Sequence, residues 1–144
     1  MSLNDPLPFK LKIPGEDTLD WRGVRSISYR LGGLLNLSGD ALTLEWKARR
    51  HTEHVGIGGV VDEVDESPIG TMRIPCELVS RARVSGWLRP RLQMWARQID
   101  TFDGIPGARP GMLSLRIRRP DRKHAQAIAE AINQPQSALS SGDD

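Results

Sequence analysis

Apolar and polar residues alternate in several short stretches of the chain, a pattern typical of strands with one buried and one exposed face. A tight turn at Ser38-Gly39-Asp40 joins two of these stretches and predicts a β-hairpin. Gly32-Gly33 lies inside a long stretch and predicts a bulge or a sharp bend, as needed where a sheet curls into a barrel. The strands are expected around residues 9–13, 24–37, 42–46, 72–75, 78–84, 91–98 and 113–117.

Other segments lack this alternation. Residues 16–22 resemble a connector, and residues 104–111 are a loop by their glycine and proline content. The pattern also dissolves over residues 49–70, where glycines cluster and an acidic stretch follows. Two readings of this segment stay open, a long mobile loop and a short strand or hairpin at Val60-Val61.

The C-terminal part of the chain changes period. Ala125, Ile128, Ala129 and Ile132 form one apolar stripe at helical spacing, after Pro120-Asp121 at a favourable helix start. These signals predict a helix near residues 120–133. A helix with one apolar stripe must bury it, and a partly closed barrel offers an open end. We therefore expect one mainly β domain over residues 1–133, followed by a disordered tail at 134–144.

Charge is distributed unevenly along the chain, although its net value is only +2. Residues 81–123 hold eleven basic and three acidic side chains, whereas residues 53–77 hold six acidic side chains and one basic one. The basic region could meet an anionic partner. Equally, the acidic segment could fold over the basic surface or dock on a second copy of the chain, so a homodimer stays open.

Arginines on two of the expected strands are the main candidate binding residues. By the period of two, Arg81 and Arg83 share one strand face, and Arg116 and Arg118 share a face of another. If the two strands are neighbours, the four side chains form one patch. Such a patch would suit a phosphate, an acidic peptide or the acidic segment at residues 62–66.

Few reaction chemistries find support in the residues. Cys76 is the one cysteine, so an internal disulfide and a cysteine-based zinc site are excluded, and a buried structural thiol is expected. No long apolar run or secretion signal is present, which favours a cytoplasmic protein without a membrane span. The four tryptophans are scattered and are expected in the core or at its rim: Trp21, Trp46, Trp87 and Trp95.

His51-Thr52-Glu53-His54 is the most enzyme-like cluster. His51 and His54 could share a metal with a carboxylate if the segment were helical, but the spacing is not that of metalloproteases. We expect surface histidines and no catalytic, metal or cofactor site. Gly56-Ile57-Gly58-Gly59 lacks the lysine and the spacing of nucleotide-binding loops, and a flexible hinge is expected there.

The order of elements resembles the pleckstrin-homology-like superfold, and in particular a bacterial relative of that group. The hairpin of residues 33–46, the segment from Ile74-Pro75 to Val84, and the ending at residues 113–117 before a helix carry the resemblance. It implies a bent antiparallel barrel of about seven strands, capped by the C-terminal helix. Many such domains bind phosphoinositides through basic residues, and Arg30, Lys47 and Arg49 match their permissive spacing.

The expected function is that of a non-enzymatic binding or adaptor module that recognises an anionic partner or a protein surface through its arginine-rich face. A fold carries no function by itself. Two alternatives stay open: a metal-assisted enzyme that uses His51, Glu53 and His54, and a nucleic-acid-binding domain that uses the basic surface at residues 81–123. Nucleic acid is the less favoured partner, because the tryptophans are not clustered for base stacking.

Overall fold

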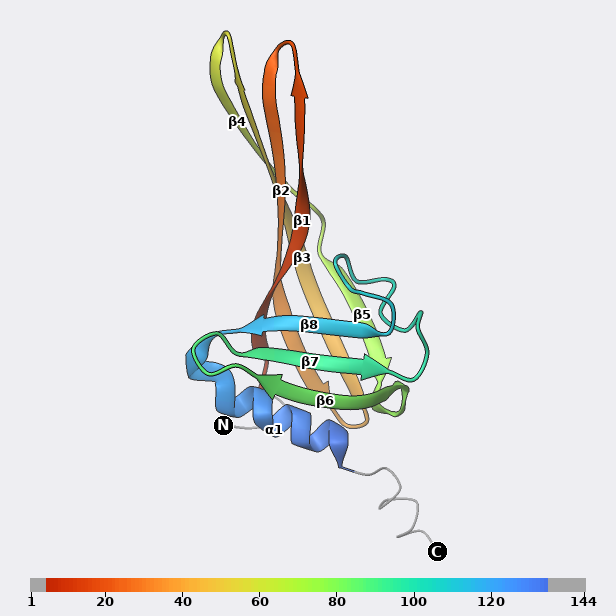
Figure 1. Ribbon diagram of the computed structural model, residues 1–144. Coiled ribbons are helices and arrows are strands. Elements are labelled where there is room, and N and C mark those ends of the chain that lie inside the picture. Colours follow the sequence, from red (N-terminus) through yellow and green to blue (C-terminus); the bar gives the residue numbers. More distant parts are fainter. Residues whose placement is uncertain (1–4, 135–144) are drawn as a thin grey trace, which may run out of the picture.

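Strands dominate the computed structural model (Figure 1), which describes residues 5–134, except for the side chains of residues 12 and 14–16. The elements are β1 (Leu7–Asp20), β2 (Gly23–Ser38), β3 (Ala41–Gly56), β4 (Gly59–Glu66), β5 (Gly70–Pro75), η1 (Cys76–Leu78), β6 (Val79–Ser85), β7 (Arg91–Ala96), β8 (Met112–Ile117), η2 (Arg119–Asp121) and α1 (Arg122–Asn133). The expectation of a mainly β chain with one C-terminal helix is confirmed. The expected tail lies, apart from Gln134, outside the described residues.

All strands belong to one antiparallel sheet with the order β4-β3-β2-β1-β8-β7-β6. Strand β3 is long enough to take two partners on its outer edge, β5 along residues 41–46 and β4 along residues 49–56. In Figure 1, β6, β7 and β8 cross the lower halves of β1, β2, β3 and β5, so the sheet folds into two layers. The sheet is not closed, since β5 and β6 are not paired in the described part of the chain.

The core fills the space between these two layers. Leu35 and Leu44 from one layer and Met94, Leu113 and Leu115 from the other are fully buried. Helix α1 covers one side with the predicted apolar stripe, in which Ala125, Ile128, Ala129 and Ile132 are all buried. Its last residue also covers the edge of β6. The Asn133 side chain accepts a hydrogen bond from the Ala82 N–H (2.8 Å) and donates one to the Ala82 carbonyl oxygen (2.6 Å).

A four-stranded extension, here called the finger, projects from this core (Figure 1). It comprises residues 13–29 of β1 and β2 and residues 50–66 of β3 and β4. Leu11 and Leu31 at its base are buried, but within the finger Thr52 is the one buried residue among the described side chains. The finger therefore has both faces largely in solvent.

The finger corrects two expectations from the sequence. The long loop at residues 49–70 is mostly strand, because β3 continues to Gly56 and β4 follows, and the alternative of a strand or hairpin at Val60-Val61 is confirmed, since both residues lie in β4. The expected connector at residues 16–22 is mostly the end of β1. Alternation of apolar and polar residues reflects one-sided burial. A sheet that is exposed on both faces imposes no such alternation, so the sequence signal disappears although the strands persist.

The bulge expected at Gly32-Gly33 is also wrong. The register between β2 and β3 is unbroken across these residues, and the irregularity lies in β1 between Ile13 and Glu16. Gly33 serves close packing instead, because a Cβ atom there would collide with the Glu45 carbonyl oxygen and lie 2.9 Å from the ring of Phe9. A Cβ atom on Gly32 would meet only the Phe9 carbonyl oxygen, at 3.9 Å.

The tryptophans divide into two pairs. Trp46 is buried in the core, as expected, and Trp95 is half-buried on the outward face of β7, beneath Arg81 and Arg83. Trp21 and Trp87 were expected to pack in the same way, but they are 81% and 68% exposed in turns between strands. Tryptophan is enriched at interfaces relative to the rest of protein surfaces, so both turns are of interest for function.

The two adjacent glycines provide a matched test of the packing. Gly33→Ala should destabilise the chain by about 1–3 kcal/mol, because the methyl group overpacks the space between β1 and β3. Gly32→Ala should change stability by no more than about 0.5–1 kcal/mol, in the stabilising direction, since its site is open and extended. Urea unfolding of both variants measures the difference. Equal midpoints for the two variants would contradict the tight approach at Gly33.

Candidate anion-binding face

Three basic side chains lie side by side where the two layers of the sheet join. Arg91 on β7 pairs in register with Arg116 on β8, and Arg116 pairs with Lys10 on β1. Residues paired in register share a face with Cβ atoms about 5 Å apart, and like charges in that position repel. All three side chains are exposed, and none forms an ion pair or side-chain hydrogen bond with another described residue. Their charge is uncompensated.

A small cavity lies at the same junction, and we call it the seam cavity. Its volume is about 180 Å³. It is lined by Pro8, Phe9 and Ile117 together with the basic residues Lys10, Arg116 and Arg118. No carboxylate lines it. The space is smaller than a typical pocket for a drug-sized ligand but suits a single anionic group such as a phosphate.

Further cations lie beside the seam cavity, next to the exposed turn between β6 and β7. The guanidinium of Arg119 lies over the ring of Trp87 at 5.1 Å, and Arg122 Nε donates a hydrogen bond to the Gly86 carbonyl oxygen (3.2 Å). The backbone of Ile117 bonds to that of Pro90 and holds this turn against β8. The Asp121 carboxylate accepts a hydrogen bond from Arg118 Nε at 2.8 Å and offsets one of these charges.

The arginines predicted from strand periodicity share an outward face but do not form one cluster. Strand β7 lies between β6 and β8, so Arg81 and Arg83 are not adjacent to Arg116 and Arg118. Arg81 and Arg83 instead flank Trp95 of β7, with distances of 4.4 Å and 5.7 Å to its ring, and Arg83 donates a hydrogen bond to the Gln93 side chain. Cation–π contacts hold these two arginines in place.

The residues suggested by the pleckstrin-homology-like spacing lie on the opposite layer. Arg30 and Arg49 are partners in register on β2 and β3. Arg49 and Lys47 both bind the Glu66 carboxylate, at 3.0 Å and 2.8 Å. Hydrogen bonds from Lys47 and then Arg49 lower the pKa of Glu66. Two of the three suggested cations are therefore engaged within the chain, and Arg30 has no ion pair with a described residue.

The acidic segment at residues 62–66 binds a different basic surface from the one expected. It forms β4 and pairs with β3, not with residues 81–123. Besides the Glu66 pairs, Arg50 binds Asp65 at 2.6 Å and His51 Nε2 lies 3.5 Å from Asp62. The hydrogen bond and negative charge of Asp65 raise the pKa of Arg50. This ladder leaves the arginines of residues 81–123 open to other contacts.

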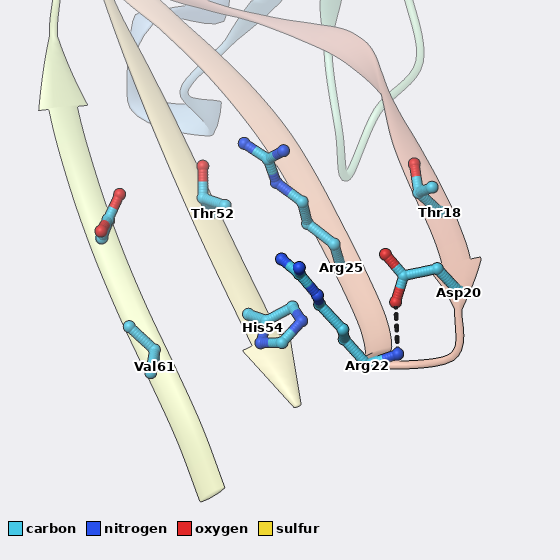
Figure 2. Close-up of a pocket in the computed structure, with 8 residues that line it drawn as sticks. Thr18, Asp20, Arg22, Arg25, Thr52, His54 and Val61 are labelled. Atoms are coloured by element: carbon cyan, nitrogen blue, oxygen red, sulfur yellow. Dashed lines mark hydrogen bonds between the residues drawn. The ribbon is translucent and has the colours of Figure 1, made fainter. Parts of the chain in front are cut away.

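A second and larger concavity lies on the finger, with a volume of about 390 Å³ (Figure 2). Figure 2 shows the Arg22 and Arg25 side chains extending in parallel beside His54, with the hydroxyl groups of Thr18 and Thr52 on either side. Asp20 and Glu63 also line it and balance the two arginines, and Asp20 accepts the turn hydrogen bond of the Arg22 N–H at 2.7 Å. The mixed charge makes this site less selective for anions than the seam cavity.

The histidine cluster and Cys76 are the remaining candidate reactive groups. His51 and His54 lie three residues apart on a strand and so point to opposite faces, which rules out one shared metal between them. Within residues 5–134, no cluster of three or more His, Cys, Asp or Glu side chains could hold a metal ion. Cys76 is buried as expected, and burial, with a smaller effect from Asp40, raises the pKa of its thiol.

Neither a protein-family model, nor a curated protein, nor a solved structure matches the chain. Among the described residues, no helix is long and apolar enough to cross a membrane. Function must therefore be argued from the site itself.

Lys10 and Arg91 were missed as site residues in the sequence, although their outward orientation on strands was readable. Only the pairing of β1 with β8 and of β8 with β7 brings them beside Arg116.

The ion-pair ladder predicts that acid loosens the finger. Because the folded-state pKa of Glu66 is lowered, its stabilising effect is present above its unfolded pKa and is lost as the pH falls through the lowered value. These pairs are exposed, so the effect should be local rather than global. Hydrogen exchange of the backbone amides, followed from neutral pH to below the pKa of an unfolded carboxylate, measures this loosening. The protection factors of β4 should fall at a higher pH than those of β7.

A matched pair of variants isolates this effect. Glu66→Gln should remove much of the acid sensitivity of β4, whereas Glu63→Gln, at a carboxylate without an ion pair to a described residue, should retain it. An unchanged response in Glu66→Gln would show that the ladder does not hold β4.

Proposed function

We propose that the chain is a non-enzymatic binding or adaptor module that recognises an anionic partner carrying a phosphate group. The proposed contact is the seam cavity with the adjoining row of Lys10, Arg91 and Arg116. The observation that carries this proposal is the uncompensated repulsion within that row. A bound anion would relieve it and accept charge-assisted hydrogen bonds from several donors at once.

The shape of the site supports recognition more than catalysis. Cations converge on one small cavity, and their supports are strands of a packed sheet rather than a mobile loop. The residues that line the cavity include no serine, threonine, cysteine, histidine or carboxylate. An array of fixed donors with no reactive partner is what binding of a phosphate group requires.

We also propose that the fold is pleckstrin-homology-like, with the finger as an insertion. Without the finger, the strands would run β5-β3-β2-β1 and β8-β7-β6, as two crossed layers with a C-terminal helix against them. This arrangement supports the resemblance seen in the sequence. The proposed anion site lies between β1 and β8, away from the residues Arg30, Lys47 and Arg49 that the family spacing suggested.

Titration with inorganic pyrophosphate tests the proposed site. Binding followed by calorimetry or amide chemical shifts should weaken about tenfold or more in Arg116→Ala, since a hydrogen bond to a charged group contributes about 1.5–3 kcal/mol. Arg97→Ala removes an exposed arginine that does not line the seam cavity and should bind like the original chain. Lys10→Ala should weaken pyrophosphate binding, as Arg116→Ala does.

Two results would contradict the proposal. One is the absence of pyrophosphate binding at low ionic strength, where anion attraction is strongest. The other is an equal loss in Arg97→Ala and Arg116→Ala, which would mean that net charge rather than a site governs binding.

A further inference from the structure

The outward side of β6, β7 and β8 carries arginines and no carboxylate. None of the three strands contains an aspartate or a glutamate. Their inward residues, such as Leu92, Met94 and Leu115, are buried in the core, whereas their outward residues are exposed or half-buried. In Figure 1 these strands lie in front of the other layer, and no described helix or strand covers them from that side. The three strands therefore offer an open face of positive charge.

The cations of this face follow one another in a line, which we call the basic track. It begins on the edge strand β6, crosses β7 and β8, and ends on β1: Arg81, Arg83, Arg91, Arg116 and Lys10. Alternate residues of a strand are about 7 Å apart and partners in register about 5 Å apart, so each cation lies about 5–8 Å from the next. None of them forms an ion pair with a described residue. The track can therefore bind successive negative charges of an extended polyanion.

The basic track bends around a patch without charge, which we call the uncharged patch. It consists of residues that are partners in register on β7 and β8: Gln93, Trp95, Met112 and Ser114. All of them are half-buried, and neither Trp95 nor Met112 is packed in the hydrophobic core. The guanidinium groups of Arg81 and Arg83 lie 4.4 Å and 5.7 Å from the Trp95 ring. The patch therefore offers an aromatic ring, an amide and a hydroxyl group beside a line of cations.

Single-stranded nucleic acid has the same two parts. Its phosphates form a continuous line of charge, and its bases are flat groups with hydrogen-bonding edges beside that line. Bases stack on aromatic rings and on guanidinium planes. We propose that the outward face of β6, β7 and β8 binds a single strand of nucleic acid, with phosphates along the basic track and bases over the uncharged patch. This inference rests on the proposed function, since Lys10, Arg91 and Arg116 belong to both sites, and it names the class of the partner that carries the phosphate.

The order of the strands answers an objection from the sequence. The sequence disfavours a nucleic-acid partner because the tryptophans are scattered along the chain. Strand pairing nevertheless places Trp95 beside arginines of β6, in register with Arg81. Because guanidinium planes also stack on bases, one ring with two guanidinium groups can serve where clustered aromatic side chains are absent.

Two other polyanions match only one of the two parts. An acidic peptide has carboxylates for the basic track, but it has no flat uncharged group beside each charge. An anionic lipid surface calls for apolar side chains that project beyond the cations, and Trp95 is instead half-buried beneath Arg81 and Arg83. The exposed apolar side chains of this layer, Trp87 and Leu88, lie in the turn between β6 and β7. Both partners are therefore outcomes of the test.

Fluorescence anisotropy with a labelled single-stranded DNA of about ten nucleotides tests the basic track. The dissociation constant should be about 1–100 µM at physiological salt. With about four phosphates bound, the logarithm of the association constant should fall against the logarithm of the salt concentration with a slope of about −3. Arg83→Gln should weaken binding several-fold and make this slope shallower by about 0.7. Arg30→Gln, which removes an exposed arginine from the opposite layer, is the matched control and should bind like the original chain.

An abasic strand of the same length separates the bases from the phosphates. The original chain should bind it about tenfold more weakly than the DNA, because every phosphate remains and the stacking is lost. Trp95→Ala should weaken DNA binding by a similar factor, keep the salt slope and abolish the preference for the strand with bases. Trp21→Ala, which removes an exposed tryptophan from the tip of the finger, should change none of these quantities. Trp95 lies outside the core, so its variant should stay folded, and the arginine variants test the track independently of it.

Several results would overturn the proposal. They are the absence of DNA binding at low salt, equal losses in Arg30→Gln and Arg83→Gln, and an abasic strand or a duplex that binds as tightly as the single strand. Displacement of the DNA by poly-glutamate at equal charge concentration assigns the face to an acidic protein instead. Binding to vesicles of anionic phospholipid in place of DNA, abolished by Trp87→Ala and kept in Trp95→Ala, assigns this layer to a membrane.

Pyrophosphate separates this proposal from the function on which it rests. Arg81, Arg83 and Trp95 do not line the seam cavity, so their variants should bind pyrophosphate like the original chain. Pyrophosphate binding without DNA binding overturns the nucleic-acid partner and leaves the proposed function in place. DNA binding without pyrophosphate binding removes the seam cavity as an anion site and leaves the nucleic-acid face.

Discussion

The antiparallel pairing of β2 with β3 is the constraint on which the rest of the structure depends. Each strand has 16 residues, and the register runs without a break from the tip pair Gly23 and Gly56 to Ser38 and Ala41 near the turn. One half of this ribbon forms a wall of the core, and the other half is the axis of the finger. Because side chains alternate strictly along such a ribbon, a single register decides which residues face the core and the concavity of the finger, and which face the opposite side.

The two halves of the ribbon are stabilised by different interactions. In the half that forms the core, burial of leucines between two layers holds the strands, and this hydrophobic contribution is the dominant one in folding. In the finger nearly all side chains are exposed, so ordering the backbone must be offset by cross-strand hydrogen bonds and by ion pairs such as Arg50 with Asp65. A sheet exposed on both faces has limited stability alone.

The sequence was sufficient for the parts of the fold that are buried on one side. Alternation located β6, β7 and β8, and the apolar stripe from Ala125 to Ile132 located α1 close to its observed bounds. The finger could not be read in this way, because strands with two polar faces have the composition of a loop. Close packing at Gly33 was likewise mistaken for a bulge, since a glycine inside a strand marks either feature.

The candidate site was predictable only in part, for a reason of topology. Periodicity showed that Arg81, Arg83 and Arg116 point outward, but not which strands are neighbours. The pairing of β1 with β8 adds Lys10 to the site, and the insertion of β7 separates Arg81 and Arg83 from Arg116. The acidic segment was expected to fold over the basic surface at residues 81–123 or to dock on a second copy. Its partner within the chain is instead the adjacent strand β3, because a hairpin brings the two together at the lowest entropic cost.

The most direct test of the central claim, the continuous β2–β3 ribbon, is an NMR measurement of cross-strand contacts in the finger. Alternate pairs in an antiparallel ladder bring Hα atoms close together, so nuclear Overhauser effects between opposing Hα atoms report the register. The backbone groups of Ala48 point away from β2, so Leu31 and Ala48 are a non-hydrogen-bonded pair, and every second pair from there to the tip is of the same kind. The structure therefore predicts close Hα contacts between Ile27 and Thr52 and between Arg25 and His54. Contacts that end at Tyr29 and Arg50, with random-coil shifts beyond them, would contradict the finger and every surface assigned to it.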